Sequence, residues 1–187
     1  MTPKSEIYNC DCLEYMKGLP DKYFSLAIAD PPYGDAKDSV GRTGGTWAAK
    51  YGKTINEWDI APSKEFFEEL VRVSENQIIW GANYFPNMPP TRCFLIWRKL
   101  SISDSFTMAM AEYAWTSFND NAKVFEIAPQ GKKSDPRFHP TQKPIKLYAW
   151  LLQNYARGGG NLRPYARERK FKNRGVQAGL RLCGVRT

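Results

Sequence analysis

The chain has 187 residues, of which 42% are hydrophobic and 14% aromatic, which is enough apolar surface for one domain and excludes a disordered chain. No segment approaches the roughly 20 apolar residues of a membrane span, and the N-terminal residues lack the apolar stretch of a secretory signal. The formal net charge is +8, but residues 161–187 contribute +7 of it, so the excess does not belong to the rest of the chain.

Apolar patterning in the first half predicts alternating strands and helices. We expect a strand over residues 6–9 and a short helix over residues 12–18, capped by Asp11 and ended by Gly18. Residues 24–29 are apolar on both faces, as in a buried parallel strand. Residues 34–60 are rich in Gly, Lys, Asp and Thr and predict a long loop. Pro62 and Ser63 begin a helix that reaches about Ser74.

The second half continues the alternation. Strands are expected over residues 77–80, 94–97, 112–115 and 123–127, and a helix over residues 144–156 with Pro144 in its first turn. Strand–helix alternation predicts an α/β layer fold. Trp80, Trp97 and Trp115 are expected in its core. Arg42, Lys50 and Lys53 in the long loop could contact phosphate, although solvated charges explain them equally well.

Metal chemistry has few candidate ligands in this chain. It contains four cysteines and a single histidine, His139, and the spacing of Cys10 and Cys12 does not fit a structural zinc site. We therefore expect no metal. Free thiols are typical of a reducing compartment, so we expect a cytoplasmic protein without membrane contact.

The sharpest motif is Ala-Asp-Pro-Pro-Tyr-Gly at residues 29–34, directly after the buried strand. In open α/β sheets ligands bind beyond the carboxyl ends of strands. Two prolines remove two backbone donors and stiffen the turn, which leaves the Asp30 carboxylate, free carbonyls and the Tyr33 ring. Such a group suits the amino group of a nucleobase. The alternative is a proline-rich turn with a solvated Asp30 and a surface Tyr33.

Several segments together resemble the amino-methylating DNA methyltransferases. Residues 30–33, Asp-Pro-Pro-Tyr, match catalytic motif IV, and its form with Asp first is typical of enzymes that methylate the 6-amino group of adenine. Residues 8–14 and 19–21 are similar to the lead-in that contains motif III. Residues 78–85 are similar to a string of this family, and residues 138–144, Phe-His-Pro-Thr-Gln-Lys-Pro, to motif X. The order of motifs is that of the permuted, beta-class enzymes.

The resemblance implies a Rossmann-like fold and S-adenosylmethionine (SAM) as cofactor. Double-stranded DNA would be the partner, with the target adenine flipped out of the helix. Asp30 and the Pro31 carbonyl would accept the two N–H bonds of the adenine amine, Pro32 would stiffen the turn, and Tyr33 would stack on the base. The implied cofactor-binding residues are Asp11, Cys12, Ala29, Asp30, Thr141, Gln142, Lys143 and Pro144.

Some roles stay open at this point. Asp11 could contact the cofactor or simply cap its helix. His139 fits a structural or cofactor-edge role better than that of a catalytic base. Methylation of the 4-amino group of cytosine is the alternative reaction, which the aspartate at residue 30 disfavours.

The pattern breaks after residue 156. In the permuted order, motif X should lead to motif I, a strand followed by Asp-Pro and a Gly-x-Gly loop, but residues 157–187 show no apolar strand that leads into Asp-Pro and such a loop. One set of codons that fits residues 161–186, with the degenerate positions chosen, encodes the following string when read one base later: Ile-Phe-Asp-Pro-Met-Arg-Gly-Ser-Gly-Ser-Ser-Arg-Ile-Ala-Ala-Tyr-Lys-Leu-Gly-Phe-Asp-Phe-Val-Gly-Cys. That string contains the missing strand and glycine loop. The three glycines at residues 158–160 are a plausible slip site for a frameshift.

We therefore expect a methyltransferase domain over residues 1–156 and a basic, out-of-frame, disordered tail over residues 157–187. The sheet would be incomplete because the motif I strand is missing, and its open edge would favour a homodimer or aggregation. Such a truncated copy would bind SAM weakly and be weakly active or inactive. The alternative to a frameshift is a natural basic tail that binds nucleic acid. The alternative function is a non-catalytic remnant that binds nucleic acid through its tail.

Overall fold

The computed structural model describes residues 4–34, 60–105, 109–129, 142–156, 161–163 and 181–186. Most of the expected long loop therefore lies outside the described residues, as do Arg42, Lys50, Lys53, His139 and Thr141. No helix among the described segments is long and apolar enough to cross a membrane.

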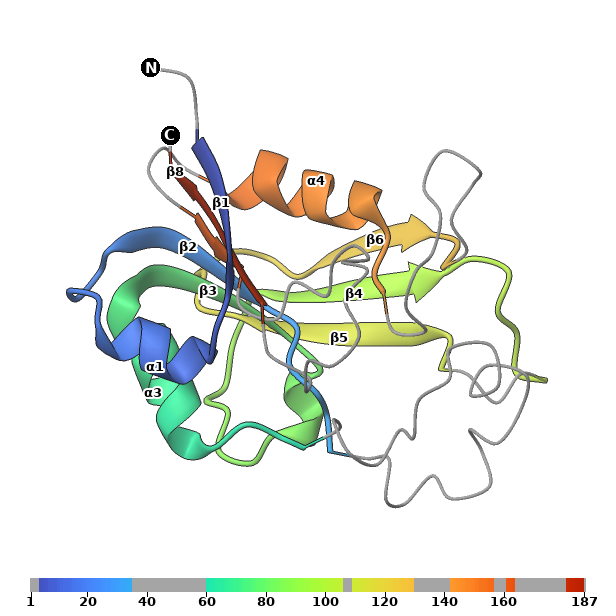
Figure 1. Cartoon of the computed structure of the whole chain (residues 1–187). Coiled ribbons are helices and arrows are strands. Elements are labelled where there is room, and N and C mark those ends of the chain that lie inside the picture. The colour runs from blue at the N-terminus through green and yellow to red at the C-terminus, as the bar shows by residue number, and fades with distance from the viewer. Residues whose placement is uncertain are drawn as a thin grey trace, which may run out of the picture.

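One mixed sheet forms the centre of the molecule (Figure 1). The strand order across it is β1-β8-β7-β2-β3-β5-β4-β6. The strands are β1 (Lys4–Asn9), β2 (Phe24–Ala29), β3 (Ser74–Trp80), β4 (Phe94–Lys99), β5 (Ala111–Thr116), β6 (Lys123–Ile127), β7 (Asn161–Arg163) and β8 (Arg181–Arg186). The six strands expected from the sequence are all present, and four of them are longer by two or three residues than predicted.

The direction of the strands fixes which ends share an edge. Strands β2 and β3 are parallel, whereas β5 runs antiparallel to both β3 and β4. Consequently the carboxyl ends of β2, β3 and β4 lie at the same edge of the sheet as the beginning of β5. Strand β6 runs parallel to β4 at the outer edge.

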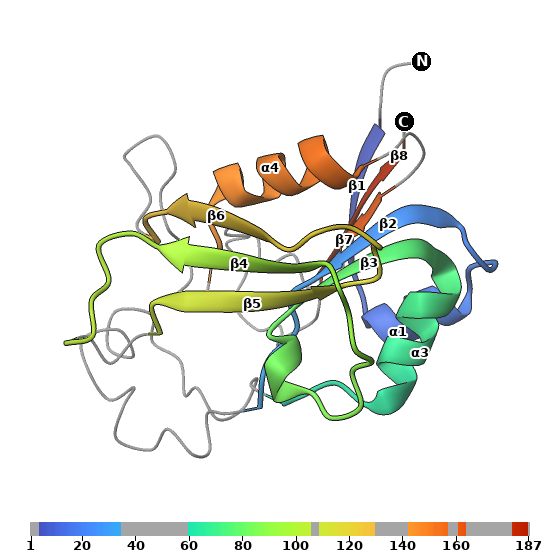
Figure 2. The ribbon, with the colours of Figure 1, turned by 180° about the vertical axis from the view of Figure 1, so that it is seen from behind.

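Helices cover both faces of the sheet. Figures 1 and 2 show α1 (Cys12–Lys17) and α3 (Lys64–Val73) on one face and α4 (Ile145–Tyr155) on the other. Residues of β2 alternate between these layers: Ala27 and Ala29 pack in the cluster of α1 and α3, and Leu26 and Ile28 pack in the cluster of α4. The expected α/β layer fold is confirmed, and β2 is buried on both faces as predicted.

The local sequence signals act as predicted. Asp11 caps α1 by accepting hydrogen bonds from the backbone N–H groups of Leu13 and Glu14, at 2.8 and 3.1 Å. Ser63 caps α3 through Phe66, and Pro144 directly precedes α4. The predicted core tryptophans are confirmed, since Trp80, Trp97 and Trp115 are all buried.

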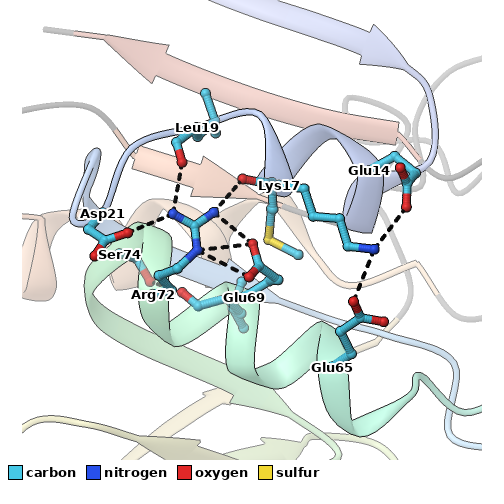
Figure 3. Close-up of polar contacts among 10 residues, drawn as sticks. Glu14, Lys17, Leu19, Asp21, Glu65, Glu69, Arg72 and Ser74 are labelled. Carbon is cyan, nitrogen blue, oxygen red and sulfur yellow. Dashed lines mark hydrogen bonds and ion pairs between the residues drawn. The ribbon is translucent and has the colours of Figure 1, made fainter.

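Arg72 joins the two helices on the α1 face (Figure 3). Its guanidinium donates to the carbonyls of Met16 and Leu19, each at 2.8 Å, and pairs with Asp21 and Glu69, each at 2.7 Å. The carbonyls at the end of α1 lack helical partners, so an arginine that satisfies them fixes where α1 lies on α3.

The expectation of a bare sheet edge beside β2 is wrong. Strand β7 pairs in parallel with β2 through two residue pairs, Leu26 with Asn161 and Ala27 with Leu162, and β8 links β7 to β1. The physical reason is that an open edge offers backbone N–H and C=O groups, and any extended segment can pair with them regardless of its side chains. The three glycines at residues 158–160 precede β7, and no Asp-Pro followed by a Gly-x-Gly sequence occurs in residues 157–187.

The described segments before and after residues 35–59 meet at one point. A Cβ atom built on Gly34 would lie 3.1 Å from the Cβ of Ala61, and Gly34 adopts a φ of +73° that favours glycine. The two ends of this segment therefore lie in contact, just beyond the motif at residues 30–33.

Candidate active site

The turn after β2 holds the candidate catalytic residues at the carboxyl end of the strand. Pro31 is buried, while the side chains of Asp30, Pro32 and Tyr33 are partly buried. The two prolines donate no backbone hydrogen bonds, and their fixed φ angles restrict the turn. The motif is therefore a constrained end of a core strand, and the alternative of a solvated surface turn is wrong.

Gly81, at the end of β3, makes room for Tyr33. A Cβ atom at residue 81 would lie 2.1 Å from Cε1 of the Tyr33 ring, and Gly81 has a φ of +69°. Both the contact and the backbone angle require glycine here. Gly81 belongs to residues 78–85, which resemble a string of the amino-methylating DNA methyltransferases. One function of these residues is to let the ring of Tyr33, from the Asp-Pro-Pro-Tyr motif, lie against the end of β3.

Aromatic rings surround Tyr33. The ring of Tyr84 stacks on it with centroids 4.9 Å apart and planes at 11°, and Phe85 meets it edge-on at 6.2 Å. Tyr84 is 46% exposed, so the stacked pair reaches the surface. A planar ligand that stacks on this face of Tyr33 must therefore displace Tyr84.

Lys143 brings the second motif to the first. Its ammonium nitrogen lies 2.5 Å from Oδ1 of Asp30, 3.0 Å from Oε2 of Glu112 and 3.2 Å from the hydroxyl of Tyr33. The Lys143 side chain is 3% exposed. A lysine ammonium has three N–H donors, and these three partners match them. The ammonium therefore has a defined position between two carboxylates and a phenol.

Lys99 completes the set of charges from the neighbouring strand. Its ammonium pairs with Oε1 of Glu112 at 2.7 Å, and the Lys99 side chain is 7% exposed. Two carboxylates and two ammonium groups thus lie in one chain of contacts, Lys99–Glu112–Lys143–Asp30. Charges removed from water are tolerated only when paired, and this cluster is electrically neutral.

The pairing controls ionisation. Burial by itself would lower the pKa of Lys143, but Asp30 and Glu112 raise it well above its usual value. Burial would raise the pKa of Glu112, yet Lys143 and Lys99 lower it to about 2. Burial is the main cause that raises the pKa of Tyr33, helped by both carboxylates and opposed by Lys143. At neutral pH the site therefore holds an ammonium, a carboxylate and a protonated phenol.

The structure brings only some of the predicted cofactor residues to this point. Lys143 contacts Asp30, and Ala29 directly precedes it and is buried. Cys12 is the first residue of α1 and is buried, and the carboxylate of Asp11 caps the same helix. Gln142 and Pro144 flank Lys143, whereas Thr141 lies outside the described residues. The cofactor roles of these residues stay predictions.

Sequence reasoning missed Glu112 and Lys99. Each is a charged residue at the end of an apolar strand, and the pairing of Trp97 with Glu112 places both at the edge that Asp30 occupies. A charged residue at a strand end is a weak signal, because most such residues are solvated. The antiparallel register of β4 and β5 was needed to find them.

Other candidate sites are not supported in the described part of the chain. The side chains described there include no group of three His, Cys, Asp or Glu that could hold a metal ion. Cys10, Cys12 and Cys93 are free thiols, as predicted. No family model matches the chain, and no curated protein matches it.

Proposed function

We propose that this chain is a copy of a SAM-dependent DNA methyltransferase that acts on the exocyclic amino group of adenine. The observation that carries the proposal is the contact between Lys143 and Asp30. These residues belong to two different motifs that are 113 positions apart, and they meet at the carboxyl end of a buried strand. Two separate strings that resemble one family and converge on one site support that family more strongly than either string alone.

The chemistry of the site fits an amine substrate. An adenine amine is a poor nucleophile because its lone pair is delocalised into the ring. Acceptance of its two N–H bonds by the Asp30 carboxylate and the Pro31 carbonyl would draw the nitrogen toward tetrahedral geometry, and the fixed turn would hold both acceptors in place. Tyr33 would stack on the base once Tyr84 has moved aside.

The residues present do not fit the cofactor cradle. The strand beside β2 is Asn161–Arg163, and Pro164 and Tyr165 follow it in place of a glycine loop. Proline and tyrosine each carry a Cβ atom, so this sequence does not supply the close backbone approach that a glycine loop allows. We therefore propose that this chain binds SAM weakly or not at all, as expected for a frameshifted copy.

Titration calorimetry and methyl-transfer assays test the proposal. Titration calorimetry of the chain with SAM should show no binding in the micromolar range. The same titration on a frame-restored protein should show binding, and that protein should transfer labelled methyl groups to DNA. In the restored protein, Asp30→Ala should lower turnover by about 10²- to 10³-fold and spare SAM affinity.

Asp104→Ala is the matched control, because Asp104 is exposed and lies outside the site. Near-normal turnover of Asp30→Ala would contradict the proposed role of Asp30. Micromolar SAM binding by the present chain would contradict the frameshift interpretation. Methyl transfer to cytosine in place of adenine would favour the alternative reaction.

The second candidate function is a non-catalytic nucleic-acid-binding remnant. The charge of +7 in residues 161–187 favours it. Each phosphate contact made by Lys or Arg contributes about one unit to the slope of log affinity against log salt. A remnant of this kind would bind DNA with a steep salt dependence that disappears when the chain ends at Ala156.

A further inference from the structure

Glu112 is the residue of this site that neither motif contains. It lies near the beginning of β5, and its two carboxylate oxygens have separate partners. Oε1 pairs with Lys99 at 2.7 Å, and Oε2 pairs with Lys143 at 3.0 Å. Strands β4 and β5 thus present a fixed acceptor to the lysine of the second motif.

We propose that Glu112 is a positioning residue for Asp30, which acts by holding the Lys143 ammonium against one oxygen of the Asp30 carboxylate. Lys143 and the Tyr33 hydroxyl both contact Oδ1 of Asp30, at 2.5 and 3.3 Å. Within the described residues, the hydrogen bonds and the ion pair of the Asp30 carboxylate all use Oδ1 and none uses Oδ2. This division leaves Oδ2 as the oxygen that can accept an amine N–H.

The three N–H donors and the positive charge of Lys143 link Glu112 to Asp30. Without Glu112, one N–H of a buried ammonium would lose its acceptor, and Lys143 would turn to engage both oxygens of Asp30. A buried donor without a partner is costly, so this rearrangement is the expected response. Glu112 therefore has an effect on Asp30 although nothing indicates direct contact between them. The catalytic meaning of this effect rests on the proposed function, but the coupling itself does not.

A cycle of variants of the full chain measures the coupling by urea unfolding. Asp30→Asn leaves Lys143 with Glu112, and Glu112→Gln leaves it with Asp30. The double variant leaves a buried ammonium without a carboxylate, so it should lose more stability than the two single variants together.

The same cycle in a Lys143→Met background should give a smaller coupling of the same sign. The part of the coupling that comes from the ammonium, which either carboxylate can neutralise, is then lost, and only the direct repulsion between the two carboxylates remains. A merely structural Glu112 would give the same coupling in both backgrounds. A coupling of zero, or one that Lys143→Met leaves unchanged, would overturn the proposal.

If one variant of the cycle does not fold, a nuclear magnetic resonance measurement still tests the proposal. The ¹⁵N signal of the Lys143 ammonium, identified by its loss in Lys143→Arg, should be protected from exchange with water in the unmodified chain. Glu112→Asp keeps the charge but shortens the side chain, so this protection should be lost. Glu126→Asp is the control, because Glu126 pairs with Arg98 at the exposed surface.

Persistence of the protected signal in Glu112→Asp would show that Glu112 does not hold Lys143. None of these measurements uses SAM, DNA or methyl transfer. Their failure would therefore leave the proposed function intact, and failure of the methylation assay would leave this coupling intact.

Discussion

A hydrogen atom in place of a methyl group at residue 81 decides where the Tyr33 ring can lie. Gly81→Ala would place a Cβ 2.1 Å from the ring and force alanine into a positive φ. We expect a loss of about 1–3 kcal/mol in the free energy of unfolding, because both a strained backbone and overpacking contribute. Urea unfolding measures the loss, and near-ultraviolet circular dichroism should report the displaced ring.

Gly18→Ala is the matched control for that substitution. Gly18 follows α1 with a φ of −78°, and a Cβ there would meet only the Tyr15 carbonyl oxygen at an ordinary 3.5 Å. Its effect should be small. Equal losses at residues 18 and 81 would show that the Tyr33 contact does not restrict residue 81.

Glu112 makes stability depend on pH. Its pKa is lowered to about 2, so the stabilisation it provides is complete above about pH 4.5 and is lost as the pH falls toward 2. The groups that face it are Lys143, Lys99 and the Tyr33 hydroxyl. Glu112→Gln should therefore flatten the plot of unfolding free energy against pH in this window. Glu126→Gln, which removes an exposed pair, should leave the slope unchanged, and a steep slope in both variants would contradict this assignment.

At the residue scale, the sequence singled out Asp30 and Lys143 separately, and the structure brings them into contact, while their catalytic and cofactor roles stay predictions. Asp30 and Lys143 were identified from strings that combine rare residue types in a fixed order. Glu112 was not, because its role depends on which residue of β5 faces the end of β4. That register is a tertiary property, and no local pattern encodes it.

At the scale of the element, substitutions of Asp11 distinguish its role as a helix cap from a contact with the cofactor. Asp11→Ala should cost about 1 kcal/mol, because two N–H groups of α1 lose their acceptor, whereas Asp11→Asn should be close to unchanged. Urea unfolding compares the two. If Asp11→Asn loses as much unfolding free energy as Asp11→Ala, the charge of Asp11 matters beyond capping, and a cofactor contact is favoured.

The bounds of most elements could be predicted because each carries its own boundary signal. Helix α3 begins after Ser63, and β2 ends at the prolines of the motif. The antiparallel direction of β5 could not be predicted, since an apolar strand reads the same in either direction. Strands β7 and β8 were missed for a different reason: their segments are basic and lack a strand pattern, and backbone pairing alone accounts for them.

At the scale of the molecule, the sheet divides into a part with a packed core and a part joined by few pairs. Strands β2, β3, β5 and β4 carry the buried apolar clusters, whereas β7 pairs with β2 through two residue pairs. A chain that ends at Ala156 should therefore keep the first part folded. Hydrogen exchange should find Ile78 and Leu95 still protected and the amides of β1 no longer protected, because β1 pairs with β8. Loss of protection at Ile78 would show that β7 is needed for the whole fold.

The contact between Gly34 and Ala61 makes the segment between these two residues suitable for replacement or for insertion of another domain. Because the two ends meet, a linker of a few residues could replace residues 35–60, and each halving of a loop lowers the entropic cost of closure by only about 0.6 kcal/mol. The same geometry accepts a foreign domain whose own termini lie close together. Such a guest would be attached one residue after Tyr33, so a reporter inserted there would lie beside the candidate active site.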